Sequence, residues 1–243
     1  MNINKPNLKI IRKCYDILLE YYGEQGWWPV GANRTNEPSY TITNKNRIMS
    51  HEEKWEIIVG SILTQNTNWK NVIKSFADLA NPSFPSPKEI LDMDLEKLAM
   101  LIYSSGYRNQ KALRLKNIAN FFLENKFDKL SEYDIPRLRN ILLSLNGIGN
   151  ETADSIILYA FSKPSFVVDA YTKRLLIRLN LISEKTTYND IQNIFHENLP
   201  KDSEIFNEYH ALIVEHGKKH CQKTKPICET CPLSIDKICS YQI

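Results

Sequence analysis

Apolar side chains recur at helical spacing along most of the chain. Over residues 8–22 the apolar face consists of Ile11, Cys14, Tyr15, Leu18 and Tyr22. This spacing of three and four positions predicts one amphipathic helix. Residues 31–50 are polar and aperiodic, which predicts a long loop. No stretch alternates long enough to indicate a β-hairpin, and only Pro164–Asp169 is expected to be extended. The pattern therefore predicts an all-α fold.

Helix start signals recur at regular intervals. Ser50 and Glu53 have the spacing of a capping box and precede "WEIIVGSIL", which predicts a largely buried helix. Further starts are marked by Ser86–Pro87 with Glu89, by Asp94 and by Pro136. Helical patterns also cover "WKNVIKSFADLA", before Pro82, and "NQKALRLKNIANFFLEN".

Composition and charge exclude few functions. With 243 residues the chain can form one large domain or two smaller ones. No apolar run is long enough to span a bilayer, and the N-terminus lacks the apolar segment of a secretory signal. We therefore expect a cytoplasmic monomer without a membrane partner. The net charge of +3 permits nucleic-acid binding without requiring it.

Four of the five cysteines lie within the last 23 residues: Cys221, Cys228, Cys231 and Cys239. In a cytosolic chain such clustering favours a metal site over disulfides. Four thiolates suit either zinc or an iron–sulfur cluster, but zinc ribbons usually contain two C-x2-C pairs and this chain has one. Lys223 and Lys225 lie between the first two cysteines and form either a solvated surface or a phosphate-binding one. The isolated Cys14 is expected to be a buried apolar residue.

A glycine-rich turn separates two helical segments in "LNGIGNETADSI". Gly147 and Gly149 flank Ile148, and Asn150 is expected to cap the following helix. The unpaired N–H groups at such a helix start attract phosphate. Taken alone, the pattern fits equally a plain turn between two packed helices.

The segment from Leu145 to Leu179 resembles the helix-hairpin-helix–Gly/Pro–Asp motif of the endonuclease III superfamily of DNA glycosylases. The likeness rests on the hairpin, on the small-residue helix after it, and on "VVDAYTKRL", which places Asp169 eighteen residues after Glu151. It extends through "GSILTQNTNWKNV", "SSGYRNQKALRL" and the cysteines. The resemblance implies a two-lobed fold, with a helical barrel domain at 48–163 and a discontinuous domain at 1–47 and 164–243. It also implies a [4Fe–4S] cluster at residues 221–239, although the last cysteine gap is two residues longer than usual.

The resemblance implies that double-stranded DNA containing a damaged base binds in the cleft between the lobes. It also implies a cytoplasmic protein associated with the nucleoid. "LTQNTN" matches the segment whose glutamine inserts into the duplex, so Gln65 is the expected insertion residue and Asn66 its neighbour. A polar helix end is the alternative interpretation. Expected contacts to the DNA backbone come from Gly147, Ile148, Gly149, Thr152, Lys223 and Lys225.

Glu151 occupies the position at which bifunctional members of the superfamily carry a lysine. That lysine forms a Schiff base with the sugar, which a carboxylate cannot do. The resemblance therefore implies a monofunctional glycosylase that uses water, with Asp169 stabilising the oxocarbenium-like transition state at the start of a helix. Without the motif, Asp169 would be only a helix cap. Glu151 itself could position water, contact the flipped nucleotide or be a tolerated polar residue.

Three tryptophans are candidates for the base pocket. Trp27 and Trp28 are adjacent in "GEQGWWPVG", and Trp69 follows the insertion segment. With Glu151, this resembles the branch of 3-methyladenine DNA glycosylases that contains MagIII, although that branch lacks the cysteines. An alkylated purine is cationic, and an aromatic ring attracts it by about 0.5–2 kcal/mol. The tryptophans could instead be structural.

Three alternatives to this function remain open. The enzyme could remove uracil, mismatched thymine or hypoxanthine by the same mechanism. It could be an endonuclease III-like lyase that uses another amine, such as Lys173. It could also be a catalytically silent DNA-binding protein.

Overall fold

The buried helix expected after Ser50 is α3 (His51–Leu63) in the computed structural model, which describes residues 8–31 and 49–241. Ser50 Oγ accepts a hydrogen bond from Glu53 N at 3.2 Å, and the Glu53 carboxylate accepts one from Ser50 N at 3.0 Å. This confirms the predicted capping box. Isoleucine, valine and leucine side chains of α3 are fully buried, so the helix can pack on several sides.

The chain divides into two units, which we call the discontinuous unit (Met1–Trp27 with Pro164–Ile243) and the continuous unit (Trp28–Lys163). The expected boundary lay at residue 48, but Trp28 already packs within the continuous unit, against Gly60 of α3. Most of the loop predicted at residues 31–50 lies outside the described residues.

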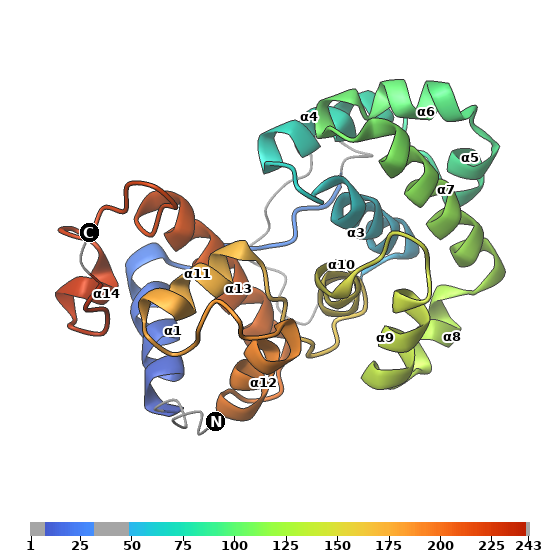
Figure 1. Cartoon of the computed structure of the whole chain (residues 1–243). Coiled ribbons are helices and arrows are strands. Elements are labelled where there is room, and N and C mark those ends of the chain that lie inside the picture. The colour runs from blue at the N-terminus through green and yellow to red at the C-terminus, as the bar shows by residue number, and fades with distance from the viewer. Residues whose placement is uncertain (1–7, 32–48, 242–243) are drawn as a thin grey trace. The chain divides into compact units, whose positions relative to one another are not determined.

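In the continuous unit, α3 lies at the centre and packs against α4, α7, α10 and η2 (Figure 1). The other elements are α4 (Trp69–Leu79), α5 (Pro87–Asp92), α6 (Leu95–Leu101), the 3₁₀-helix η1 (Tyr103–Ser105), α7 (Arg108–Glu124), α8 (Phe127–Glu132), α9 (Ile135–Leu143), α10 (Asn150–Ser155) and the π-helix η2 (Ile156–Ala160). The predicted starts at Ser86 and Asp94 are confirmed, since both side chains cap their helices. Pro136 lies in the first turn of α9, as predicted.

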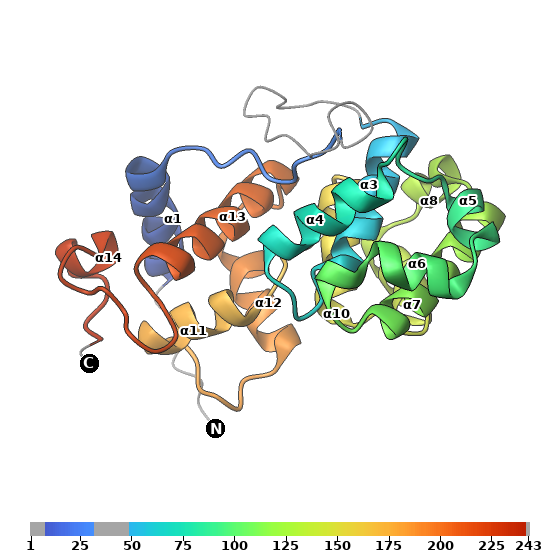
Figure 2. The same ribbon diagram turned by 90° about the horizontal axis from the view of Figure 1, so that it is seen from above.

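The discontinuous unit joins the two ends of the chain. Helix α1 (Leu8–Tyr22) has the predicted bounds and packs against α12 (Tyr188–Asn198), α13 (Ser203–Lys219) and α14 (Pro232–Ile235) (Figure 2). Its apolar face is fully buried at Ile11, Cys14 and Leu18. Tyr209 of α13 fixes the register, because its hydroxyl donates a hydrogen bond to Ile11 O at 2.9 Å.

The described residues form helices and contain no β-strand, which confirms the all-α class. The segment 164–168 is irregular rather than helical and leads into α11 (Ala170–Arg178). Among the described residues, no helix combines the length and apolarity needed to cross a membrane.

Helices α11 and α13 approach closely at Gly217. A Cβ atom at this position would overlap Cδ1 of Tyr171 and lie 3.1 Å from Nη2 of Arg174. Both of these side chains come from α11. The absence of a side chain at Gly217 therefore sets how close α11 and α13 can pack.

Replacing Gly217 by alanine should lower the free energy of unfolding by about 1–3 kcal/mol, because α11 must move or Tyr171 must adopt a strained rotamer. Denaturant unfolding followed by circular dichroism would measure the change. Lys218→Ala is the control, since this neighbour on the same helix is exposed. Equal stability of the two variants would contradict the assigned packing.

Candidate active site and DNA-binding elements

The predicted hairpin is the turn between α9 and α10 in the continuous unit. Gly147 has a φ of +88°, a left-handed conformation that favours glycine. A Cβ atom at Gly147 would also overlap the side chain of Arg114, which lies across the turn. Ile148 is buried, and its N–H donates to Leu145 O at 3.1 Å. The turn is therefore fixed by its glycine, by an apolar anchor and by an arginine from α7.

The prediction that Asn150 caps α10 is wrong. Gly149 is the N-cap residue, and no side chain caps the helix. Asn150 Oδ1 instead accepts a hydrogen bond from Arg139 Nη2 at 3.0 Å. The same guanidinium binds both carboxylate oxygens of the fully buried Asp154, at 2.9 and 3.0 Å. This bidentate ion pair fixes α9 against α10. Because Arg139 also binds the Asn150 side chain, that side chain does not cap α10.

Gln65 lies against the hairpin. Its Nε2 donates to Gly147 O at 3.0 Å and to Thr152 Oγ1 at 2.9 Å, while its Oε1 accepts from Arg114 Nη1. Three predicted DNA-contacting residues are thus brought together within one unit. Thr152 is buried and its hydroxyl faces Gln65. Asn66 is exposed and adopts a φ of +51° at the end of the turn after α3.

Glu151 lies in the first turn of α10 and is exposed. An acidic residue is favoured there by the helix dipole. The position that carries a lysine in bifunctional members of the superfamily therefore presents a carboxylate at the surface of the continuous unit.

Asp169 is the N-cap residue of α11 in the discontinuous unit, which confirms its predicted position. Its Oδ1 accepts a hydrogen bond from Thr172 N at 2.7 Å, and its Oδ2 lies 3.6 Å from Nε2 of His210 on α13. Both side chains are largely buried, since 13% of Asp169 and 11% of His210 is exposed. Burial alone would raise the pKa of Asp169, but His210 and the Thr172 N–H outweigh it and hold the pKa below its usual value.

His210 is a partner of Asp169 that sequence reasoning missed. The two residues lie on different helices, and no local motif links them. The only sequence signal is a histidine among the buried positions of α13, where it follows Tyr209 and precedes Leu212 and Ile213. A histidine on an apolar helix face is more often a satisfied core residue than part of a catalytic site.

Trp28 and Trp69 lie together in the continuous unit, whereas Trp27 belongs to the discontinuous unit. The ring centroids of Trp28 and Trp69 are 5.5 Å apart in an edge-to-face arrangement. Tyr159, on the π-helix η2, adds a third ring 5.2 Å from Trp28. A Cβ atom at Gly60 would lie 2.8 Å from Trp28 Cζ2, so this glycine leaves room for the indole. The result is an aromatic cluster of Trp28, Trp69 and Tyr159, of which sequence reasoning missed Tyr159.

A buried carboxylate on α3 binds the backbone just after Trp28. Glu56 of α3 is 2% exposed, and its Oε2 accepts a hydrogen bond from Gly31 N at 2.7 Å. This bond ties the segment that carries Trp28 to α3. Nothing in the sequence marked Glu56, because it falls within an otherwise apolar helix.

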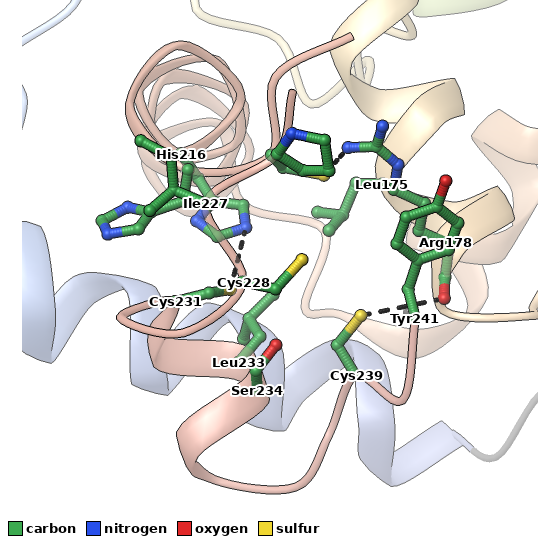
Figure 3. A pocket seen from close by; sticks show the side chains of 13 residues that line it. Leu175, Arg178, His216, Ile227, Cys228, Cys231, Leu233, Ser234, Cys239 and Tyr241 are labelled. Atoms are coloured by element: carbon green, nitrogen blue, oxygen red, sulfur yellow. Dashed lines mark hydrogen bonds between the residues drawn. The ribbon is translucent and has the colours of Figure 1, made fainter. Parts of the chain in front are cut away.

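The four clustered cysteines line one pocket of the discontinuous unit, together with Arg178 and His216 (Figure 3). Arg178 Nη1 donates to Cys221 Sγ at 3.1 Å, and His216 Nε2 lies 3.9 Å from Cys231 Sγ. None of the four forms a disulfide. Within the described ranges, no three histidine, cysteine, aspartate or glutamate side chains are arranged to hold a single metal ion.

The remaining predicted residues of this region divide by exposure. Lys223 and Lys225 are exposed on the loop that joins the first two cysteines of the pocket. Cys14 is fully buried on α1, and burial raises the pKa of its thiol to about 12. It is therefore an apolar core residue, as predicted, while the lysines remain available to solvent.

Comparison with known proteins identifies the family. Residues 59–201 match the family described as HhH-GPD superfamily base excision DNA repair protein. The chain is 47% identical over 239 residues to MJ1434 of Methanocaldococcus jannaschii, which is named as a candidate DNA repair glycosylase, with 95% of this chain and 97% of that protein covered. The chain belongs to the helix-hairpin-helix–Gly/Pro–Asp superfamily of base excision DNA repair proteins, and it is a DNA repair glycosylase of this superfamily.

Two solved structures share its fold. A trapped covalent intermediate of endonuclease III with DNA superposes with a TM-score of 0.74 at 21% identity, covering 96% of both chains. The H. pylori 3-methyladenine DNA glycosylase MagIII, bound to 1,N6-ethenoadenine, superposes with a TM-score of 0.65 at 26% identity. That comparison covers 87% of this chain and 97% of MagIII.

Replacing His210 by alanine should raise the pKa of Asp169, because burial then acts on the carboxylate without its basic neighbour. The carboxyl-carbon NMR signal, assigned through Asp169→Asn, would report the titration. The carboxylate should protonate at higher pH in the variant than in the wild type. His51→Ala is a control, since this exposed histidine pairs with Asp128 in the other unit. An unchanged titration would show that His210 does not stabilise the anion.

Proposed function

We propose that this protein is a monofunctional DNA glycosylase, which hydrolyses the N-glycosidic bond of a flipped, damaged base and leaves an abasic site. The observation that carries the proposal is Asp169, a largely buried carboxylate with a lowered pKa at the start of a helix. It remains ionised at neutral pH. An anion there can stabilise positive charge that develops on the sugar and can orient the attacking water.

Glu151 supports hydrolysis rather than lyase chemistry. A carboxylate cannot form the imine through which a lysine cleaves the DNA strand. It is exposed in the first turn of α10, the helix that follows the hairpin. We assign it no further role in the reaction.

An alkylated purine such as 3-methyladenine is the proposed substrate. Such a base is cationic, and its glycosidic bond is already weak, so little acid catalysis is needed. The aromatic cluster supports this choice because ring faces attract cations. The likeness to MagIII, a 3-methyladenine DNA glycosylase, points the same way.

The proposed partner is double-stranded DNA that contains the damaged base. A flipped base leaves a gap in the stack, which Gln65 would fill. The hairpin at residues 147–149 and the exposed Lys223 and Lys225 would contact phosphates, which position the duplex without reading its sequence.

A [4Fe–4S] cluster is the proposed cofactor, held by the thiolates of Cys221, Cys228, Cys231 and Cys239. The residues fit this group, because four soft donors line one pocket and Arg178 offsets thiolate charge. Zinc ribbons usually contain two C-x2-C pairs and this chain has one, which favours the cluster over zinc. The cluster would supply no chemistry to base release and would hold the C-terminal segment in place.

Duplexes that each carry one lesion test the function: methylated purines, uracil, hypoxanthine, a T·G mismatch and oxidised pyrimidines. We expect strand cleavage only after hot alkali, on methylated purines, and no adduct after borohydride. Asp169→Asn should lower base release by about 100-fold or more while DNA binding is retained.

Each other outcome corrects one part of the proposal. Alkali-dependent cleavage at uracil or the T·G mismatch would change the substrate only. Cleavage without alkali, or a borohydride adduct, would refute the interpretation of Glu151. No release from any lesion would make the protein a silent DNA-binding member of the family.

The purified protein should be brown and should contain about four iron atoms per chain. Cys231→Ser should lose both the colour and the iron, because a serine hydroxyl is a poorer ligand for iron than a thiolate. Cys14→Ser should retain them, since Cys14 lies outside the pocket. A colourless protein with stoichiometric zinc would overturn the cofactor.

A further inference from the structure

Lys111 on α7 is a buried cation that the proposed reaction does not use. Lys111 is 1% exposed, and its ammonium group donates three hydrogen bonds. The acceptors are Leu63 O at 2.8 Å, Thr67 Oγ1 at 2.7 Å and Ser105 O at 2.6 Å. An ammonium has three donors, so each one is satisfied. Burial, and then the charge of Arg114, lowers the pKa of Lys111 to about 8, which leaves it largely protonated at neutral pH.

These acceptors enclose the turn that carries Gln65. Leu63 is the last residue of α3, and Thr67 closes the turn two residues before α4 begins at Trp69. Ser105 belongs to η1, and its carbonyl oxygen also accepts from the Thr67 hydroxyl. One ammonium group therefore binds the turn on both sides of Gln65, through the Leu63 carbonyl before it and the Thr67 hydroxyl after it.

Arg114 lies one turn after Lys111 on α7 and holds the Gln65 side chain. Its Nη1 donates to Gln65 Oε1, and its aliphatic part occupies the space left by Gly147. The Gln65 Nε2 group donates its two hydrogen bonds to Gly147 O and Thr152 Oγ1. Two cations of α7 thus hold this region. Lys111 binds the turn, and Arg114 binds the Gln65 side chain.

We propose that Lys111 and Arg114 are positioning residues that preset Gln65, next to the hairpin, for insertion into the duplex. This inference rests on the proposed function. Neither cation needs to touch DNA for this role. Fixing the turn in advance removes part of the ordering cost that insertion would otherwise carry, which favours the inserted state.

The same helix provides a matched control. Lys116 also donates from Nζ to two backbone carbonyl oxygens, Leu91 O at 2.6 Å and Met93 O. Those acceptors belong to the α5 region rather than to the turn at Gln65. Removing Lys116 therefore removes a comparable interaction of α7 without affecting the insertion residue.

A double-mutant cycle with Gln65→Ala tests the inference. Single-turnover base release measures the reaction, and fluorescence of 2-aminopurine beside the lesion measures unstacking of the duplex. We expect Lys111→Met to lower both the rate and the fluorescence amplitude by about tenfold. In the Gln65→Ala background the same substitution should have little further effect, because the residue that it positions is gone. Lys116→Met should act equally in both backgrounds.

Arg114→Met provides a second cycle if Lys111→Met fails to fold, because Arg114 is only partly buried. Equal losses with and without Gln65 would overturn the inference and make both cations structural only. If the wild type releases no base, the proposed function fails instead. The 2-aminopurine signal then decides the inference by itself, since insertion must show the same non-additivity.

Discussion

The ends of a helix leave backbone N–H and C=O groups without partners inside the helix. In this protein, side chains to which we assign a function bind such backbone groups. Asp169 accepts from a free N–H group at the start of α11. Lys111 donates to the last carbonyl of α3. Helix α10 begins at Gly149 without a side-chain cap, so its first N–H groups are left for other partners. Capping therefore both stabilises these helices and orients the residues to which we assign a function.

The two acidic residues at the candidate site, Glu151 and Asp169, both lie at a helix start but differ in environment. Glu151 is exposed in the first turn of α10, where the helix dipole favours its anion. Asp169 is largely buried, so its charge depends on His210 and on the Thr172 N–H. Burial makes these partners stronger than they would be in water, because no solvent screens them. The carboxylate to which we assign charge stabilisation, Asp169, is thus the one with a fixed polar environment.

Local sequence signals predicted local structure well. Helix α1 has its predicted bounds, and Ser50 with Glu53 forms the predicted capping box, since both features depend on residues close in the chain. Non-local contacts were beyond these signals. Asn150 is not a cap because Arg139 of the preceding helix binds it. A lysine in "NQKALRL" suggests a solvated charge, and only the fold shows three carbonyl and hydroxyl acceptors around Lys111. His210, Glu56 and Tyr159 were missed for the same reason.

The contribution of both chain ends to one unit constrains folding during synthesis. Helix α1 is complete at Tyr22, but its partner α12 begins only at Tyr188. At ordinary translation rates these segments are separated by on the order of ten seconds. Through that interval the face formed by Ile11, Cys14 and Leu18 has none of its final neighbours, whereas the continuous unit can fold as soon as it leaves the ribosome. The protein therefore completes its discontinuous unit last, and α1 is the segment for which a nascent-chain chaperone would be of most use.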